Sequence, residues 1–171
     1  MQVAVVCGNP KPKSRTLEAG LFVAERLTGT SPQVVLDLVD IGAHLLGWGD
    51  PVASDAVERV RACDVGVFAS PTYKGSYTGL LKLFLDQVPT DGFSGLIAFP
   101  LMLGAAMGHA LAPDVFLKPV LVELGAACPA RGLYLLETDY TSEAIITPWV
   151  ERARPFLARR SGIPPDAASL L

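Results

Sequence analysis

Near its start the chain reads Val3-Ala4-Val5-Val6-Cys7-Gly8-Asn9-Pro10-Lys11-Pro12-Lys13-Ser14-Arg15-Thr16, an apolar run followed by a loop. The run Val3–Cys7 has the composition of a strand that is buried on both faces. The residues after the loop place Leu17, Leu21 and Ala24 on one side of a helix, which predicts an amphipathic helix over Thr16–Leu27. A buried strand that leads through a short loop into such a helix is the repeating unit of an α/β fold.

The same alternation continues along the chain. Further apolar runs with the features of buried strands are Val34–Leu38, Val65–Ala69, Leu96–Leu103 and Leu133–Leu136. Longer segments of helical character lie between and after them, at Asp55–Ala62, Thr78–Val88, Val115–Ala127 and Ser142–Arg160. Five strands that alternate with five helices predict an α/β fold with a doubly wound parallel sheet and helices on both faces.

Length and composition fit one domain of this kind. The chain has 171 residues, 50% of them apolar and 18% charged, which is enough to bury one core and excludes disorder over most of its length. We expect one domain over residues 1–160 and a C-terminal tail over residues 161–171. The formal net charge is −3 and the basic residues are spread along the chain, so no nucleic-acid-binding face is predicted.

An uncharged stretch, Gly92–Pro113, raises the question of a membrane span. It contains prolines, glycines and a histidine, so a buried strand followed by a glycine-rich loop and a packed helix explains it better than a span of about 20 apolar residues. The N-terminus has no basic region ahead of an apolar one. We therefore predict no secretory signal and expect a cytoplasmic protein.

The cysteines and histidines do not form a recognisable framework. Cys7, Cys63 and Cys128 are an odd number without a paired spacing, so we predict neither disulfides nor a zinc site but buried, reduced thiols. His44 and His109 lie far apart in the sequence, without a second ligand at a metal-binding spacing. No metal is predicted.

The loop Gly8–Thr16 is the first candidate site. Ligands of a doubly wound sheet bind beyond the carboxyl ends of the strands, and in a flavodoxin-like sheet of order 2-1-3-4-5 the site lies between strands one and three. Hydroxyls such as that of Ser14 and the free N–H groups of a helix start make an anion site, to which Arg15 adds a bidentate fork. The alternative is a plain helix cap by Ser14 with exposed lysines.

Two sequence motifs that this loop lacks limit the class of ligand that it could bind. It contains neither G-x-G-x-x-G for a dinucleotide nor G-x-x-x-x-G-K-[ST] for a nucleoside triphosphate, which leaves a mononucleotide phosphate. A thiolate at Cys7 ahead of a phosphate loop would resemble low-molecular-weight tyrosine phosphatases, whose motif is C-x-x-x-x-x-R-[ST]. Here Lys13 stands at the arginine position, so we predict that Cys7 is the last buried residue of the first strand.

The second candidate loop carries a resemblance to a known family. It reads Ser70-Pro71-Thr72-Tyr73-Lys74-Gly75-Ser76-Tyr77-Thr78-Gly79-Leu80-Leu81-Lys82-Leu83-Phe84-Leu85-Asp86. This resembles the NADPH-dependent FMN reductase family, in particular the reductases that supply alkanesulfonate monooxygenases, whose loop reads much like S-P-x-Y-K-x-S-Y-x-G-x-L-K-x-x-L-D. The resemblance extends from Met1 to about Leu135 and includes Leu117–Leu121.

The resemblance implies a flavodoxin-like NAD(P)H:FMN oxidoreductase that takes hydride from NADPH to FMN and supplies reduced FMN to a monooxygenase. It also implies the residues that border the flavin ring, which are Pro71, Thr72, Tyr73, Lys74 and Gly75. From the residues themselves, the proline sets a turn, the glycine allows close approach and the tyrosine offers a ring. The alternative for Tyr73 and Tyr77 is packing on neighbouring helices.

The other two loops match the family in part. The phosphate loop of the family resembles G-S-P-R-x-x-S-R-S, which is matched by Gly8, Pro10, Ser14 and Arg15, while Asn9, Lys11 and Thr16 replace other members of the motif. After strand four the family tends toward A-T-G-G, where this chain has Leu103, Gly104 and Ala105. Gly104 fits, but a threonine hydroxyl that could bond the flavin is lost. We therefore expect flavin affinity to differ from that of the family.

Some family members carry a tyrosine in the fourth helix that is linked to a local π-bulge and to flavin transfer. Val115 stands at this position, so we expect that device to be absent. His109, which follows the fourth strand, is interpreted as structural. Lys11, Lys13 and Arg15 are candidates to meet the 2′-phosphate of NADPH.

No catalytic acid or base is predicted, because the cofactors carry the hydride transfer and the three loops contain no carboxylate. A quinone or azo-compound reductase that retains FMN is one alternative. A flavodoxin-like electron carrier is another, although the chain lacks the strongly acidic face that such carriers use for docking. The helices Thr78–Val88 and Val115–Ala127 are apolar almost all round, which predicts a homodimer or homotetramer.

Overall fold

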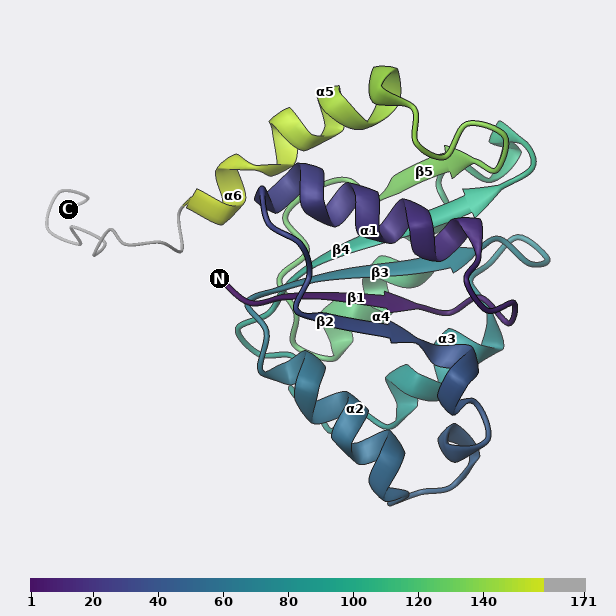
Figure 1. Ribbon diagram of the computed structural model, residues 1–171, viewed down its shortest axis with the longest axis vertical. Helices are drawn as coiled ribbons and strands as arrows, with labels where there is room; N and C mark the ends of the chain where they lie inside the picture. The colour runs from purple at the N-terminus through teal and green to yellow at the C-terminus, as the bar shows by residue number, and fades with distance from the viewer. Residues whose placement is uncertain (159–171) are drawn as a thin grey trace, which may run out of the picture.

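The computed structural model describes residues 1–158 and contains a five-stranded parallel sheet (Figure 1). Its strands are β1 (Val3–Cys7), β2 (Val34–Asp37), β3 (Val65–Pro71), β4 (Ile97–Gly104) and β5 (Leu133–Leu136). The strand order is β2-β1-β3-β4-β5, and every neighbouring pair is parallel. The predicted doubly wound sheet of order 2-1-3-4-5 is therefore confirmed.

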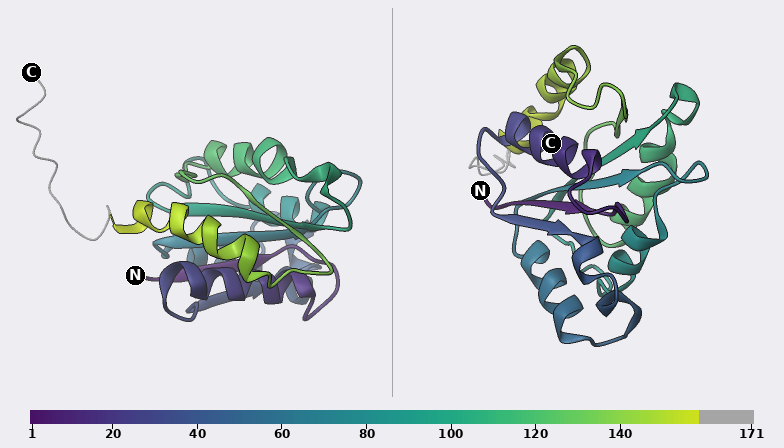
Figure 2. Two further views of the ribbon diagram at one scale, coloured as in Figure 1. Left: turned by 90° about the horizontal axis from the view of Figure 1, so that it is seen from above. Right: turned by 45° about the vertical axis from the view of Figure 1, so that its right-hand side comes forward.

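Helices cover both faces of the sheet, as predicted. They are α1 (Arg15–Thr28), α2 (Pro51–Arg61), α3 (Gly79–Asp86), α4 (Lys118–Glu123), α5 (Glu143–Ala153) and α6 (Pro155–Ala158). Figure 2 shows α1 and α5 on one side of the sheet and α4 on the other. Two hydrophobic clusters form the core, one between the sheet and α1, α5 and α6, the other between the sheet and α2, α3 and α4.

The helix boundaries follow local capping chemistry. The hydroxyl of Ser14 accepts from the N–H of Leu17 at the start of α1, and Gly29 ends this helix with φ 75°. The α2 helix begins at Pro51, four residues before the predicted start, because Asp50 caps it and a proline is tolerated in the first turn of a helix.

Short 3₁₀ helices complete the connections, namely η1 (Leu38–Ile41), η2 (His44–Leu46) and η3 (Met107–His109). The predicted last helix, Ser142–Arg160, is divided into α5 and α6 at Arg154. Residues 159 and 160 of that prediction, and the predicted tail over residues 161–171, lie outside the described residues. The division into one domain and a tail stays a prediction.

The predicted α-helix over Val115–Ala127 differs from the observed helix at its start, and the observed helix ends earlier, at Glu123. It begins with a π-helical turn, η4 (Pro113–Leu117), in which the N–H of Lys118 donates to the carbonyl of Pro113. The expectation that the π-bulge is absent was therefore wrong, and Val115, the residue expected at the tyrosine position, lies within this turn. Pro119 offers a physical reason, because it has no N–H for the carbonyl of Val115 and its ring would clash with that carbonyl in a regular α-helix.

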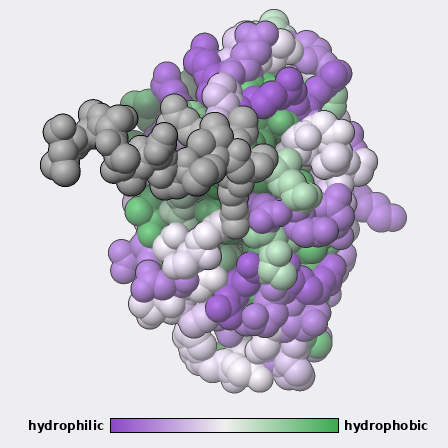
Figure 3. All heavy atoms as spheres, turned by 90° about the vertical axis from the view of Figure 1, so that its left-hand side faces the viewer, coloured by the Kyte–Doolittle hydropathy of each residue, from purple (hydrophilic) through white to green (hydrophobic). Residues whose placement is uncertain are grey.

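The uncharged stretch Gly92–Pro113 forms β4, η3 and the loops around them, so its interpretation as a buried strand is confirmed. Within residues 1–158, no helix is long and apolar enough to cross a membrane. In the same part of the chain, no three His, Cys, Asp or Glu side chains are grouped so that they could hold a metal ion. The face at the amino ends of the strands presents a mixture of hydrophilic and apolar residues (Figure 3).

Candidate functional site

The carboxyl ends of β1, β3, β4 and β5 surround a cavity of about 430 Å³. It is lined by Asn9, Lys11, Pro12, Lys13, Ser14, Arg15, Thr16, Pro71, Tyr73, Leu103 and Glu137. The structure thus brings together the two loops that the sequence singled out and the end of the fourth strand. The cavity lies where doubly wound sheets bind their ligands.

Three backbone donors lie at the start of α1, in residues that line this cavity. The N–H groups of Ser14, Arg15 and Thr16 have no acceptor within residues 1–158. They precede the first intrahelical bond, at the positive end of the helix dipole. The structure therefore combines the two interpretations of Ser14, since its hydroxyl caps α1 while the amides of the same turn stay available to an anion.

Asn9 organises this loop from inside. It is 8% exposed. Its side-chain Nδ2 donates to the hydroxyl of Thr16 at 2.9 Å, and its side-chain Oδ1 accepts from the N–H of Lys11 at 2.9 Å. An unpaired buried amide would be costly, so these bonds hold the loop in one shape. The sequence analysis treated Asn9 only as a replacement for serine. The signal that was missed is that Asn bonds backbone groups two residues onward in tight turns.

The loop is also tied to the next strand. Lys13 has a positive φ of 50°, and its N–H donates to the carboxylate of Asp37, the last residue of β2, at 2.9 Å. The other carboxylate oxygen of Asp37 is buried without a hydrogen-bond partner. Burial raises the pKa of this carboxyl group.

Cys7 ends β1 and is fully buried, as predicted. Burial raises the pKa of its thiol to about 11, with smaller contributions from neighbouring groups that include Asp37. At neutral pH the group is therefore a thiol and not the thiolate that a nucleophile requires. Full burial and a raised pKa, together with the motif spacing, disfavour the tyrosine-phosphatase interpretation.

Arg15 reaches across the cavity to the end of β5. Its Nη1 donates to the carbonyl of Glu137 at 3.0 Å, and its Nη2 lies 3.7 Å from the Glu137 carboxylate. Glu137 was not among the predicted site residues. Its position directly after the apolar run Leu133–Leu136, at the same sheet edge as the other loops, is the signal that could have found it.

The loop after β3 is a tight hairpin. Tyr73 and Ser76 exchange backbone hydrogen bonds of 2.9 and 3.1 Å, and Lys74 and Gly75 between them have φ values of 52° and 82°. Two consecutive residues with positive φ are typical of a type I′ turn, which a glycine favours. Tyr73 is 47% exposed and lines the cavity, whereas Tyr77 packs against the core. Of the two tyrosines, Tyr77 alone packs against this core, which lies between the sheet and α2, α3 and α4.

Six predicted site residues do not line this cavity, namely Gly8, Thr72, Lys74, Gly75, Gly104 and Ala105. Gly8 packs against α3, where a Cβ would come within 2.5 Å of the Leu81 side chain. Gly104 packs in the same way against Tyr134. The hydroxyl of Thr72 is buried without a partner, near Gly104. Ala105 follows β4 and is exposed.

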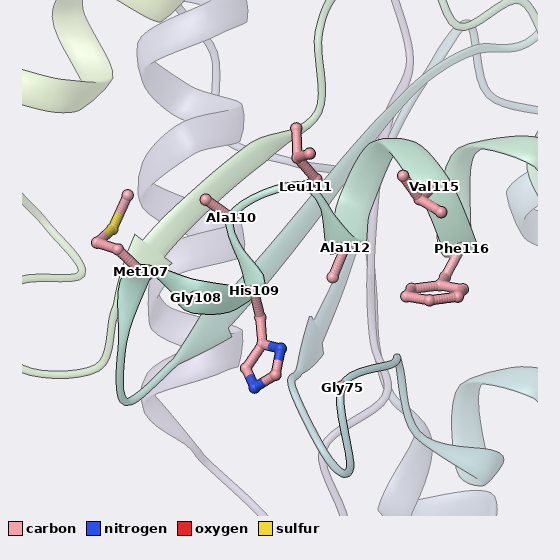
Figure 4. A pocket seen from close by; sticks show the side chains of 9 residues that line it. All are labelled: Gly75, Met107, Gly108, His109, Ala110, Leu111, Ala112, Val115 and Phe116. Carbon is pink, nitrogen blue, oxygen red and sulfur yellow. The ribbon is translucent and has the colours of Figure 1, made fainter.

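A second cavity of about 310 Å³ adjoins the hairpin (Figure 4). Apart from Gly75, its lining comes from the segment Met107–Phe116. Figure 4 shows the rings of His109 and Phe116 on the side of this segment that faces the hairpin. His109 is exposed, and its ring lies 3.8 Å from the point where a Cβ of Gly75 would be. The structural role predicted for His109 stays a prediction.

The strand order, together with a cavity between the loops after β1 and β3, defines a flavodoxin-like α/β protein. Within this class, the family model described as NADPH-dependent FMN reductase matches residues 1–141. The chain belongs to the NADPH-dependent FMN reductase family, as its resemblance predicted.

Individual relatives agree with this membership. The chain is 32% identical to "FMN reductase (NADPH)" of Pseudomonas aeruginosa, with 94% of each chain covered. It is 30% identical to "FMN reductase (NADPH)" of Escherichia coli, over 86% of this chain and 81% of the relative. Among solved structures, an apo NADH:FMN oxidoreductase (EMOB) superposes with a TM-score of 0.80 at 26% identity and covers 96% of this chain and 91% of its own.

Proposed function

We propose that the protein is an NAD(P)H:FMN oxidoreductase, which binds FMN in the 430 Å³ cavity and passes to it a hydride from NADPH. The single observation that carries this proposal is one cavity bordered by both the start of α1 and the hairpin after β3. The first offers three unpaired N–H groups to a phosphate, and the second offers apolar and aromatic surface to a flat ring. The residues present therefore fit FMN.

The proposed phosphate site comprises Gly8, Ser14, Arg15 and Thr16. Of these, Ser14, Arg15 and Thr16 line the cavity, and the bond from Asn9 leaves the Thr16 hydroxyl proton free to donate. Gly8 acts through its backbone, because the absence of a side chain lets the loop lie directly on α3. Donors held in place before the ligand arrives lose little entropy on binding.

The proposed ring site comprises Pro71, Thr72, Tyr73, Lys74 and Gly75 on one side and Leu103, Gly104 and Ala105 on the other. Pro71, Tyr73 and Leu103 line the cavity itself, and Gly75 lines the adjoining one. The buried hydroxyl of Thr72 lies next to Gly104, so a hydroxyl is present in this region although the family threonine after β4 is missing. We propose that it compensates for that loss.

Bound FMN supplies the hydride acceptor, and the protein supplies position and electrostatics. The tight hairpin and the apolar residues Pro71 and Leu103 hold the ring site in one shape and keep water from part of it. Lys11 and Lys13 line the cavity and are the proposed contacts of the NADPH 2′-phosphate. No acid or base is assigned.

The surface next to the flavin site favours self-association. The exposed apolar side chains of this surface are Met107, Leu111, Val115, Phe116 and Val122. They lie on the segment that runs from η3 through η4 to α4, whereas α3 is largely covered by the rest of the domain. We propose a homodimer or homotetramer that buries this surface. We also propose that the enzyme works in the cytoplasm and passes reduced FMN to a flavin-dependent monooxygenase.

One assay separates this function from its alternatives. Purified protein is incubated with NADPH and free FMN, with and without a quinone, while NADPH absorbance is followed. Rapid oxidation with FMN alone is expected. Oxidation that requires the quinone would favour a quinone reductase, and no turnover with either acceptor would favour an electron carrier.

A further inference from the structure

Arg15 and Glu137 face each other across the candidate phosphate site. The two side chains are 57% and 38% exposed, and both line the cavity. Among the described residues that line the cavity, Arg15 is the only arginine and Glu137 is the only residue with a carboxylate side chain. The N–H of Glu137 donates to the carbonyl of Gly104 at 3.0 Å, so the backbone that receives Arg15 is held by the sheet.

This arrangement has a consequence for an anion bound at the start of α1. A fork of both Nη atoms onto a phosphate competes with the contacts that Nη1 and Nη2 make with the Glu137 carbonyl and carboxylate. The negative charge of Glu137 also lies at the same cavity and opposes a second anion there. The nearby Glu18, on the next turn of α1, instead accepts a bond from the Tyr140 hydroxyl and does not line the cavity.

We propose that Glu137 limits the affinity of the site for FMN, by holding Arg15 when the flavin is absent and receiving it again when the flavin leaves. The inference rests on the proposed function, because it takes the phosphate of FMN as the anion. An enzyme that supplies reduced FMN to another protein must release it, and a competing carboxylate weakens the bound state without removing any donor.

The test compares FMN and riboflavin, which lacks the phosphate, by fluorescence titration of four proteins: the parent, Glu137→Gln, Arg15→Ala and the double variant. Glu137→Gln is expected to bind FMN about two- to fivefold more tightly, because it removes an exposed ion pair of small energy. Its affinity for riboflavin is expected to equal that of the parent. In the Arg15→Ala background, the same substitution is expected to change the FMN affinity less, because Glu137 and the phosphate no longer compete for an arginine.

Glu143→Gln is the matched control, because Glu143 makes a comparably exposed ion pair with Arg26 between α1 and α5. It should leave both affinities unchanged. The inference is overturned if Glu137→Gln binds FMN no more tightly than the parent, or if riboflavin and FMN affinities rise together. A parent protein that binds FMN and riboflavin equally would instead overturn the phosphate assignment of the proposed function, so the two failures are distinct.

Discussion

The α-carbon of Gly104 lies directly against the hydroxyl of Tyr134: a Cβ at position 104 would come within 1.9 Å of the tyrosine Oη. The same hydroxyl donates to the carbonyl of Ala106 at 2.8 Å. Tyr134 of β5 thereby holds the chain as it leaves β4, beside the proposed flavin site. The glycine at this position is required by packing, whatever it contributes to ligand binding.

Gly104→Ala is therefore expected to destabilise the fold. Overpacking of this kind costs about 1–3 kcal/mol, and thermal unfolding measures it. Tyr134→Phe in the same chain removes the hydroxyl oxygen and should restore part of the loss. Gly108→Ala is the control, since a Cβ there meets nothing within 4 Å. Equal melting temperatures for the parent and Gly104→Ala would contradict the prediction, because the structure would then accommodate a Cβ at position 104 without loss of stability.

Arg15→Ala tests the phosphate assignment. Loss of a charge-assisted hydrogen bond of about 1.5–3 kcal/mol corresponds to FMN binding that is roughly 10- to 150-fold weaker. Because the contacts of Arg15 with Glu137 compete with the phosphate, we expect the lower end of this range. Riboflavin should bind the variant and the parent almost equally in a fluorescence titration. A variant that loses affinity for both ligands alike would point to a disturbed fold.

Assembly is expected to depend on the apolar surface of η4. Val115 and Phe116 are 55% and 46% exposed. A glutamate at either position would be buried without a partner in the assembly, which opposes association. Val115→Glu or Phe116→Glu should therefore shift the mass measured by light scattering toward that of one chain. Val52→Glu on α2, at a comparably exposed apolar position, is the control. A parent protein that scatters as a single chain of 18.1 kDa at micromolar concentration would contradict the assembly.

Stability is expected to fall in mildly alkaline solution because of the buried thiols. Burial raises the pKa of Cys7 from 9.0 to about 11. Between these pH values the unfolded chain loses the thiol proton while the folded chain keeps it, so the free energy of unfolding decreases as the pH rises. Cys7→Ala should show a shallower decrease than the parent in denaturant titrations across pH 9 to 11, and should retain flavin reduction at neutral pH. Identical slopes would contradict the raised pKa.

The sheet was predictable because four of its strands are buried almost throughout, whereas the edge strand β2 is the exception, with Val35 40% exposed. Runs such as Val3–Cys7 and Leu133–Leu136 contain only apolar residues apart from Tyr134, which predicted buried parallel strands. The order 2-1-3-4-5 was the order of flavodoxin-like sheets and did not follow from these runs. Boundaries were less predictable, since they depend on caps such as Asp50. The π turn before Pro119 was missed because the prediction rested on one tyrosine and not on the proline that disfavours the regular helix.

The candidate site was predictable as far as it lies within continuous loops. Ser14, Arg15 and Tyr73 were found because each stands in a loop that follows a buried strand. Glu137 also follows a buried strand directly, but this position was not used, and its contact with Arg15, 122 residues away in the chain, could not be read from the sequence. Asn9 was passed over because its role depends on hydrogen bonds that only the folded loop defines.

Anaerobic oxidation of NADPH, with free FMN in large excess over the protein, measures whether the chain turns flavin over. We predict one FMN reduced for each NADPH oxidised, continuing through many flavins per protein chain, with both absorbances followed together. Reduction that stops at one flavin per chain, or NADPH that stays unoxidised while FMN is bound, would contradict the assignment of the protein as an NAD(P)H:FMN oxidoreductase.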